Sequence, residues 1–140
     1  MLVLLALALV ARSIFFSPSG ILVLQDERAP WIMLDEPITA RLHQWGRIDT
    51  PVTRFLASFE ATDPGARARL ILRSFGTARV FINDVPVPEP NPETANWKRF
   101  RELEVTQLVR RGLNAIRVEV ANRHGPALLS LWLEGAGAPF

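Results

Sequence analysis

Short runs in which apolar and polar residues alternate dominate the chain after residue 32. The clearest run is Leu113–Asn122, where Ile116, Val118 and Val120 alternate with polar or small side chains. Successive side chains of a strand point to opposite faces, so a period of two predicts strands with one buried face and one solvated face. This pattern restricts the chain to folds built from half-buried strands.

Four further runs alternate in the same way and are separated by turn-forming residues. The runs are Arg54–Ala61, Arg67–Ser74, Thr77–Ile82 and Ala127–Glu134. Many short strands at a spacing of about 8–12 residues are typical of an antiparallel β-sandwich. We therefore predict an all-β fold, an antiparallel β-sandwich, with no internal repeat and no linker inside Ile21–Glu134.

The alternation also predicts which side chains face the core. In Arg67–Ser74, Leu70 and Leu72 fall on the apolar face. The opposite face of this run, which includes Arg73, is predicted to be solvated. Trp132 alternates with leucines and is expected to face away from the core, in solvent or against a neighbouring domain.

Turn and loop signals lie between the runs. Asn83 and Asp84 separate two apolar runs and suit a two-residue hairpin, because both residue types tolerate positive φ. The segment Pro86–Trp97 holds four prolines and is expected to be a long exposed loop, because proline has no amide hydrogen for a ladder. Further on, Thr106 is expected to cap one helical turn with its hydroxyl, and Gly112 to end it.

The beginning of the chain is a separate apolar segment. Met1–Ala11 is apolar throughout, Arg12 interrupts it, and Ile14–Phe16 continues it. Sixteen helical residues span about 24 Å, which is short of a hydrocarbon core of about 30 Å. The segment has no basic residue before its apolar run, as a signal peptide would have, and no polar face, as a core helix would have.

A signal peptide, a membrane anchor and a core element all stay open, with the core element the weakest. We expect residues 1–20 to form a hydrophobic anchor or signal-like segment, with membrane contact through residues 1–16. Residues 21–136 are expected to form one β-sandwich domain outside the cytoplasm, either secreted or anchored.

The stretch from Phe75 to Glu134 resembles the galactose-binding-like jelly roll, the sugar-binding domain of beta-galactosidases, beta-glucuronidases and alpha-L-rhamnosidases. In that family a strand ends in an Asn-Gly hairpin, and a later strand leads into a D-V-T-x-L-L-x-x-G-x-N turn. Here Asn83-Asp84 stands at the hairpin, and Glu104–Asn114 matches the turn with Glu in place of Asp. The resemblance implies a jelly roll and a non-catalytic role, since the catalytic carboxylates of such glycosidases lie in a separate barrel.

The residues offer little chemistry for catalysis or metal binding. The chain has no cysteine and two histidines, which excludes thiolate nucleophiles and Cys-based zinc sites. Adjacent acidic pairs such as Asp35-Glu36 point to opposite faces of a strand and do not form an acid–base pair. We expect no catalytic residue and no cofactor, although a structural calcium of the kind some jelly rolls hold could use Asp63 and Glu134.

Nucleic-acid binding is not expected either. The formal net charge is only +2. The arginines are spread along the runs instead of being clustered with stacking aromatic residues.

Carbohydrate binding fits the residues best. It needs an exposed aromatic face together with planar polar groups that bind hydroxyls. Three polar segments offer such groups, and the predicted sugar-binding residues are Asn96, Trp97 and Arg99, then Trp45, then Asn122 and His124. For Trp97 the alternative interpretation is a lid on the sandwich core.

The sequence thus predicts a non-catalytic, membrane-associated β-sandwich module that binds carbohydrate or acts as a scaffold. One alternative is a ligand-free structural domain whose outward Trp132 and Phe81 meet another protein or a neighbouring domain of a larger chain. The other alternative is a detached accessory domain of a glycoside hydrolase.

Overall fold

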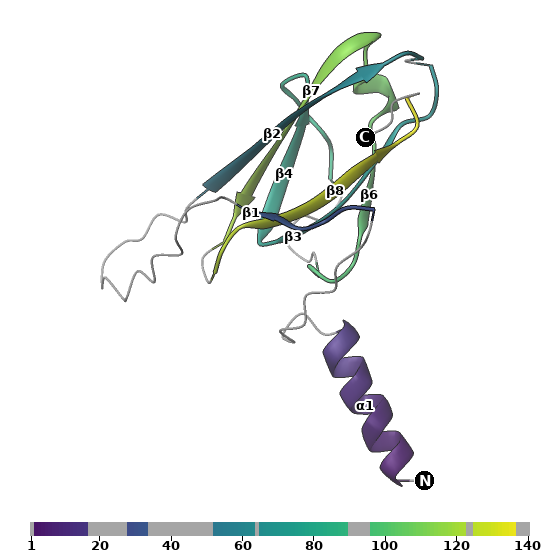
Figure 1. The fold of residues 1–140 in the computed structure, drawn as a ribbon, viewed down its shortest axis with the longest axis vertical. Helices are drawn as coiled ribbons and strands as arrows, with labels where there is room; N and C mark the ends of the chain where they lie inside the picture. The colour runs from purple at the N-terminus through teal and green to yellow at the C-terminus, as the bar shows by residue number, and fades with distance from the viewer. Residues whose placement is uncertain are drawn as a thin grey trace, which may run out of the picture.

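The fold is a sandwich of two antiparallel sheets, as predicted (Figure 1). A computed structural model of the chain describes residues 2–16, 28–33, 52–63, 65–89, 96–122 and 125–136. The elements are α1 (Leu2–Phe16), β1 (Ile32–Met33), β2 (Val52–Ala61), β3 (Arg69–Phe75), β4 (Thr77–Ile82), β5 (Val85–Pro86), β6 (Arg101–Glu104), β7 (Gly112–Ala121) and β8 (Leu128–Glu134). One four-stranded sheet has the order β1-β8-β3-β6, and the other has the order β2-β7-β4-β5.

The core lies between the two sheets and is formed by the apolar face of each run. Leu70 and Leu72 of β3 are fully buried, and they stand opposite Leu133 and Leu131 of β8. The second sheet contributes Ile116, Val118 and Val120 of β7, among others. The period of two in the sequence therefore predicts the buried face correctly.

The β4–β5 hairpin turns at Asn83 and Asp84, as predicted. Both residues have positive φ, 51° and 64°. Asn83 also donates a hydrogen bond from Nδ2 to Oδ1 of the buried Asn114, 2.9 Å away. The hairpin is thereby tied to the start of β7.

The prediction that the hydroxyl of Thr106 caps a helical turn is wrong. A 3₁₀ turn forms at Thr106–Leu108, but its N-cap is Val105 and no side chain caps it. The Thr106 hydroxyl oxygen instead accepts a hydrogen bond from the Ala68 backbone N–H, 2.8 Å away. This hydroxyl joins the turn to the segment before β3, a long-range contact that a local capping rule does not consider.

The start of the proline-rich segment is also more ordered than predicted. Pro86 belongs to β5 and pairs with Phe81 of β4, and Val87 is buried. Since β5 is the last strand of its sheet, the missing amide hydrogen of Pro86 is tolerated there. Residues 90–95 lie outside the described residues.

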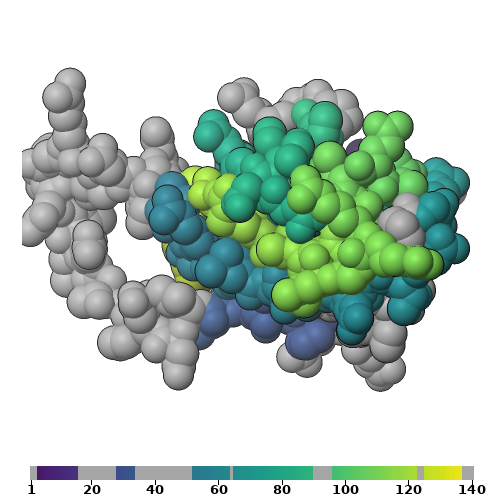
Figure 2. Space-filling view, turned by 90° about the horizontal axis from the view of Figure 1, so that it is seen from above, coloured from purple at the N-terminus to yellow at the C-terminus, as the bar shows by residue number. Residues whose placement is uncertain are grey.

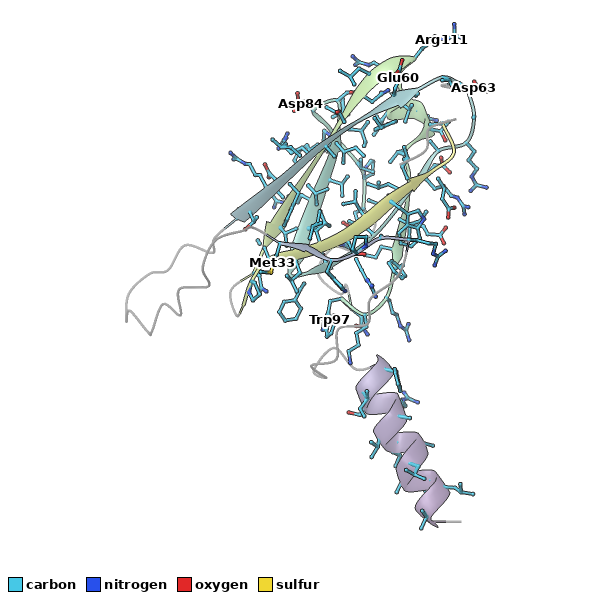
Figure 3. The ribbon with its side chains drawn as sticks, in the orientation of Figure 1. Met33, Glu60, Asp63, Asp84, Trp97 and Arg111 are labelled. Atoms are coloured by element: carbon cyan, nitrogen blue, oxygen red, sulfur yellow. The ribbon has the colours of Figure 1, made fainter. Side chains whose placement is uncertain are left out.

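Helix α1 lies beyond the end of the sandwich that carries Trp97 (Figures 1 and 3). The ammonium group of Lys98 donates to the backbone carbonyl of Ile14, one of the last carbonyls of the helix. Helix α1 has 15 residues, and within the described part of the chain no helix is long and apolar enough to cross a membrane.

Candidate functional site

The structure brings most of the predicted sugar-binding residues to one end of the sandwich. Asn96, Trp97 and Arg99 lie in the segment before β6, and Asn122 directly follows β7. Trp97 is at the end nearest α1 (Figure 3). The predicted residues Trp45 and His124 lie outside the described residues.

Trp97 forms a buried aromatic floor at this end. Its exposed fraction is 8%, and its ring meets Phe75 edge-on at 5.4 Å and Trp31 at 6.4 Å between ring centroids. The Lys98 ammonium lies 5.2 Å from the Trp97 ring centroid. The ring is therefore a lid on the end of the sandwich and has no open face on which a sugar could stack.

The two asparagines hold backbone turns around this floor. Oδ1 of Asn96 accepts the Lys98 N–H at 3.1 Å, and Nδ2 of Asn122 donates to the carbonyl of Pro126 at 2.9 Å. Both amides remain partly exposed, and the side chain of Arg99 is in solvent. Asn96 and Arg99 from the loop before β6 and Asn122 from the loop after β7 are the polar residues at this end, and we call these three residues the Trp97 rim.

Gly125 connects Asn122 to the aromatic floor. A Cβ atom at Gly125 would lie 3.2 Å from the Phe75 ring and 3.6 Å from Nδ2 of Asn122. Because Phe75 is also in edge contact with Trp97, the loop after β7 and the loop before β6 share one aromatic cluster. Residues far apart in the sequence are thus assembled at a single end.

The prediction that Arg73 is solvated is wrong. Arg73 is only 4% exposed, and its guanidinium carbon lies 4.6 Å from the Trp31 ring centroid and 4.4 Å from that of Phe100. Residues 28–33 and the segment before β6 bring these rings to the outer face of the sheet that contains β3. The sequence signal was the aromatic residue in each of these flanking segments, but nothing local shows where they pack.

Trp132 continues this outer stack, which we define as Arg28, Trp132, Phe100, Arg73 and Trp31. Its ring meets Phe100 edge-on at 4.7 Å, and the Arg28 guanidinium lies 4.8 Å from its centroid. Trp132 therefore faces away from the core as predicted, but it is covered by the chain itself. It offers much less surface to a partner than an open tryptophan would.

Phe81, on the outer face of the other sheet, is covered in a similar way. The guanidinium carbon of Arg117 lies 3.8 Å from the Phe81 ring centroid. Arg117 also pairs with Glu119 at 2.6 Å and with Asp84 at 3.3 Å. The arginine is therefore held over the ring from two sides.

Most carboxylates of the described residues are paired with arginine. The pairs are Arg54–Glu119, Arg67–Glu104, Arg69–Glu102, Arg69–Glu134, Arg101–Glu89, Arg117–Asp84 and Arg117–Glu119. A hydrogen bond from the Thr106 hydroxyl, followed by one from Arg67, lowers the pKa of Glu104 below its ordinary value.

The two acids considered for calcium have protein partners. Oδ1 of Asp63 accepts the Gly65 N–H at 3.0 Å, and Glu134 binds Arg69 and the indole N–H of Trp132. In the described part of the chain, no three His, Cys, Asp or Glu side chains gather closely enough to hold a metal ion.

Comparison with known proteins identifies the fold and little more. No protein-family model matches the chain, and no curated protein matches it in sequence. Among solved structures, the chain is similar to part of native α-L-rhamnosidase from Aspergillus terreus, with a TM-score of 0.58 and 24% identity over 81% of this chain and 15% of that one. The chain thus corresponds to a small part of that enzyme, with which it shares the β-sandwich.

Two weaker similarities involve enzymes of the same broad kind. An α-L-rhamnosidase from Dictyoglomus thermophilum gives a TM-score of 0.48 and 18% identity over 60% of this chain and 12% of that one. An FMN-binding β-glucuronidase from Faecalibacterium prausnitzii gives a TM-score of 0.46 and 17% identity over 75% and 23% of the two chains.

Proposed function

We propose that the chain is a non-catalytic accessory module of the galactose-binding-like type that contacts carbohydrate through the Trp97 rim. The observation that carries the proposal is that the loop of Asn96 and Arg99 and the loop of Asn122 meet one aromatic cluster, the edge contact of Phe75 with Trp97. Planar amide and guanidinium groups in a fixed arrangement are the groups that bind sugar hydroxyls in pairs. We place the module outside the cytoplasm, as a secreted or anchored domain.

The proposal of a non-catalytic module is supported by the state of the carboxylates. Glycoside hydrolysis uses two carboxyl groups, of which one has a raised pKa so that it can donate a proton. In the described residues, arginines hold carboxylates on both sheets, and the pKa of Glu104 is lowered. Because its pKa is lowered, Glu104 is a poor proton donor near neutral pH.

The similarity to a part of an α-L-rhamnosidase supports an accessory role beside a carbohydrate-active domain. That part is 15% of the enzyme's length, and we infer that the chemistry belongs to a separate domain. By this analogy, α-L-rhamnosides are the first ligands to test, with galactosides and glucuronides next.

Isothermal titration calorimetry of the whole chain with these sugars and their oligomers tests the proposal. We expect heat with at least one ligand, and loss of that heat in Arg99→Ala. Arg111→Ala is the matched control, because this exposed arginine lies at the opposite end of the sandwich (Figure 3). Trp97→Ala is unsuitable, because removal of a buried ring perturbs the fold.

Absence of heat with every sugar from a correctly folded chain would contradict carbohydrate binding. Equal heat from Arg99→Ala and wild type would contradict the Trp97 rim as its site. The accessory role is tested separately by the coding sequence on both sides of this one. If the chain is an accessory domain, we expect that sequence to encode a domain long enough to be a catalytic barrel.

A ligand-free interaction domain is the second candidate. The observation that favours it is the exposure of two large apolar side chains on the outer face of one sheet, Leu56 at 74% and Leu113 at 77%. The residues first considered for such a contact, Trp132 and Phe81, are covered by arginines of the same chain.

A further inference from the structure

Strand β2 is a long edge strand whose middle is open. It has ten residues and pairs with β7 on one side, and it stands at the end of the strand order of its sheet. Leu56, Ala57 and Ser58 are exposed in succession. Figure 1 shows β2 along the border of the sandwich, and in Figure 2 its blue-teal surface lies beside the yellow-green surface of β7.

The exposure of Ala57 is more informative than that of Leu56 or Ser58, because alternation places the Ala57 side chain on the core-facing side of β2. Phe59 and Ala61, on the same side of β2, are buried. Among the described residues, the facing sheet ends in the two-residue strand β1, whereas β2 has ten residues. Ala57 is thus open in the middle of β2, although Phe59 and Ala61 on the same side are buried.

The register shows which backbone groups of β2 point to the open side. The carbonyl of Ala115 accepts a hydrogen bond from Asn83 N–H at 2.9 Å, so Ala115 directs its backbone groups toward the β4 side. Backbone groups alternate in direction along a strand, so Ile116 directs its own toward β2, where it stands opposite Ala57. Ala57 consequently faces β7, and the N–H and C=O groups of Leu56 and Ser58 face outward.

The side chains of this edge are complementary to those of a second copy. In an antiparallel pairing centred on Ala57, Leu56 stands opposite Ser58 of the second copy, so that the outward backbone groups of both strands meet. Arg54 then stands opposite Glu60 of the second copy, and the two-fold symmetry forms this opposite-charge pair twice. If the pairing is centred on Leu56 instead, Arg54 stands opposite Ser58 of the second copy. If it is centred on Ser58, Leu56 stands opposite Glu60. Neither alternative pairs Arg54 with Glu60.

Both charged residues are available for this contact. The side chain of Arg54 is 70% exposed even while it pairs with Glu119. Glu60 is exposed, and among the described residues no cation lies within ion-pair distance of it. Within the sheet, Glu60 stands opposite Leu113 and Leu56 stands opposite Arg117, so neither faces a side chain of complementary character on β7.

We propose that β2 is a homodimer interface, in which a second copy of this chain adds its own β2 antiparallel and centred on Ala57. The β2-β7-β4-β5 sheet of one copy then continues into the same sheet of the second copy, and the β2 edge is no longer open to other strands. Helix α1 and the Trp97 rim lie away from the middle of β2, at one end of the sandwich (Figure 3).

Engineered cysteines test the register directly, because the chain has no cysteine of its own. Two Ala57→Cys residues would face each other in a pair whose Cα atoms are about 4.5 Å apart, within the range of a disulfide. The matched control is Ser58→Cys, whose symmetry mates are separated by about 8 Å in this register, too far for a bond. We expect mild oxidation to cross-link Ala57→Cys and not Ser58→Cys.

Charge reversal tests the affinity by sedimentation velocity of the whole chain. Glu60→Arg places like charges opposite each other twice and is expected to weaken dimerisation about tenfold or more. The double variant Arg54→Glu/Glu60→Arg restores opposite charges and should recover the dimer. Glu102→Arg on β6, an exposed reversal with the same change of net charge, should dimerise as wild type does.

A chain that sediments as a monomer at every concentration would overturn the proposal. So would a dimer that cross-links equally at positions 57 and 58, or that is insensitive to Glu60→Arg, because either result moves the contact away from this register. A dimer formed through α1 or through any other surface would also be unaffected by Glu60→Arg, and this result distinguishes it from a dimer formed through β2.

Discussion

The guanidinium carbon of Arg73, on β3, lies 4.6 Å from the centre of the ring of Trp31, which directly precedes β1. Phe100 covers the same guanidinium at 4.4 Å, so the charge is held between two aromatic rings on the outer face of a sheet. This contact fixes the segment before β1 and the segment before β6 to β3. The stack is therefore expected to stabilise the fold.

Replacement of Arg73 tests this role. We expect Arg73→Ala to lower the free energy of unfolding by about 2–4 kcal/mol, because two cation–π contacts and the packing of a buried side chain are lost. Arg73→Lys retains the charge but loses the planar stacking, so its free energy of unfolding should lie between those of Arg73→Ala and wild type. Urea denaturation measures the change. Arg79→Ala, an exposed arginine on β4, should stay within about 0.5 kcal/mol of wild type, and an equal loss in both would contradict a special role for Arg73.

Local rules predicted what local sequence determines. The strand positions and buried faces follow from alternation, and the turn at Asn83-Asp84 follows from the tolerance of these residues for positive φ. Asn114, the last residue of the turn that resembles the family's, binds the backbone of nearby Arg110.

Long-range packing was beyond these rules. Whether Arg73 is solvated depends on where residues 28–33 pack, and the Thr106 hydroxyl accepts a hydrogen bond from Ala68, 38 residues away. The sugar-binding role of Asn96, Arg99 and Asn122 stays a prediction. Their residue types singled them out, but only the fold shows that their loops meet at one end and that the Trp97 ring is closed.

The buried amide of Asn114 is expected to be a major contributor to stability. Its Oδ1 accepts hydrogen bonds from Arg110 N–H at 2.8 Å and from Asn83 Nδ2 at 2.9 Å, while its Nδ2 donates to the carbonyls of Arg110 and Gly112. Asn114→Ala removes these four hydrogen bonds, and should lower the free energy of unfolding by about 2–4 kcal/mol.

A double-mutant cycle separates the pair from the rest of this network. With Asn83→Ala as the second variant, we expect the two losses to be non-additive by about 1 kcal/mol, since the residues share a hydrogen bond. Additive losses in thermal or chemical unfolding would show that the Asn83–Asn114 bond contributes nothing beyond the backbone contacts of each residue.

Two glycines with positive φ allow the cost of backbone strain to be compared with the cost of strain plus a steric clash. Gly135 has a φ of 86°, and a Cβ atom there would lie 1.8 Å from the carbonyl oxygen of Arg67. Gly112 has a φ of 88°, but a Cβ atom would meet nothing within 4 Å. We expect Gly112→Ala to cost about 1–2 kcal/mol from backbone strain alone, and Gly135→Ala to cost clearly more. Equal losses in thermal unfolding would mean that the chain around Arg67 moves aside freely.

The lowered pKa of Glu104 predicts a contribution to stability that depends on pH. A carboxyl group with a lower pKa in the folded chain stabilises the fold fully above its unfolded value, here 4.5, and this stabilisation is lost as the pH falls through the folded pKa. The difference in unfolding free energy between wild type and Glu104→Gln should therefore be largest near neutral pH and shrink below pH 4.5. Other carboxyl groups are common to both proteins and cancel in this comparison.

The cause of the shift can be tested on the same carboxyl group. The hydrogen bond from the Thr106 hydroxyl is the largest contribution, ahead of that from Arg67. We expect Thr106→Val to raise the pKa of Glu104 toward its ordinary value, and Arg67→Ala to raise it less. Carbon-13 NMR titration of the Glu104 carboxyl measures both pKa values. An unchanged pKa in Thr106→Val would mean that the hydroxyl serves Ala68 alone, and that the contact with Glu104 does not stabilise the charge.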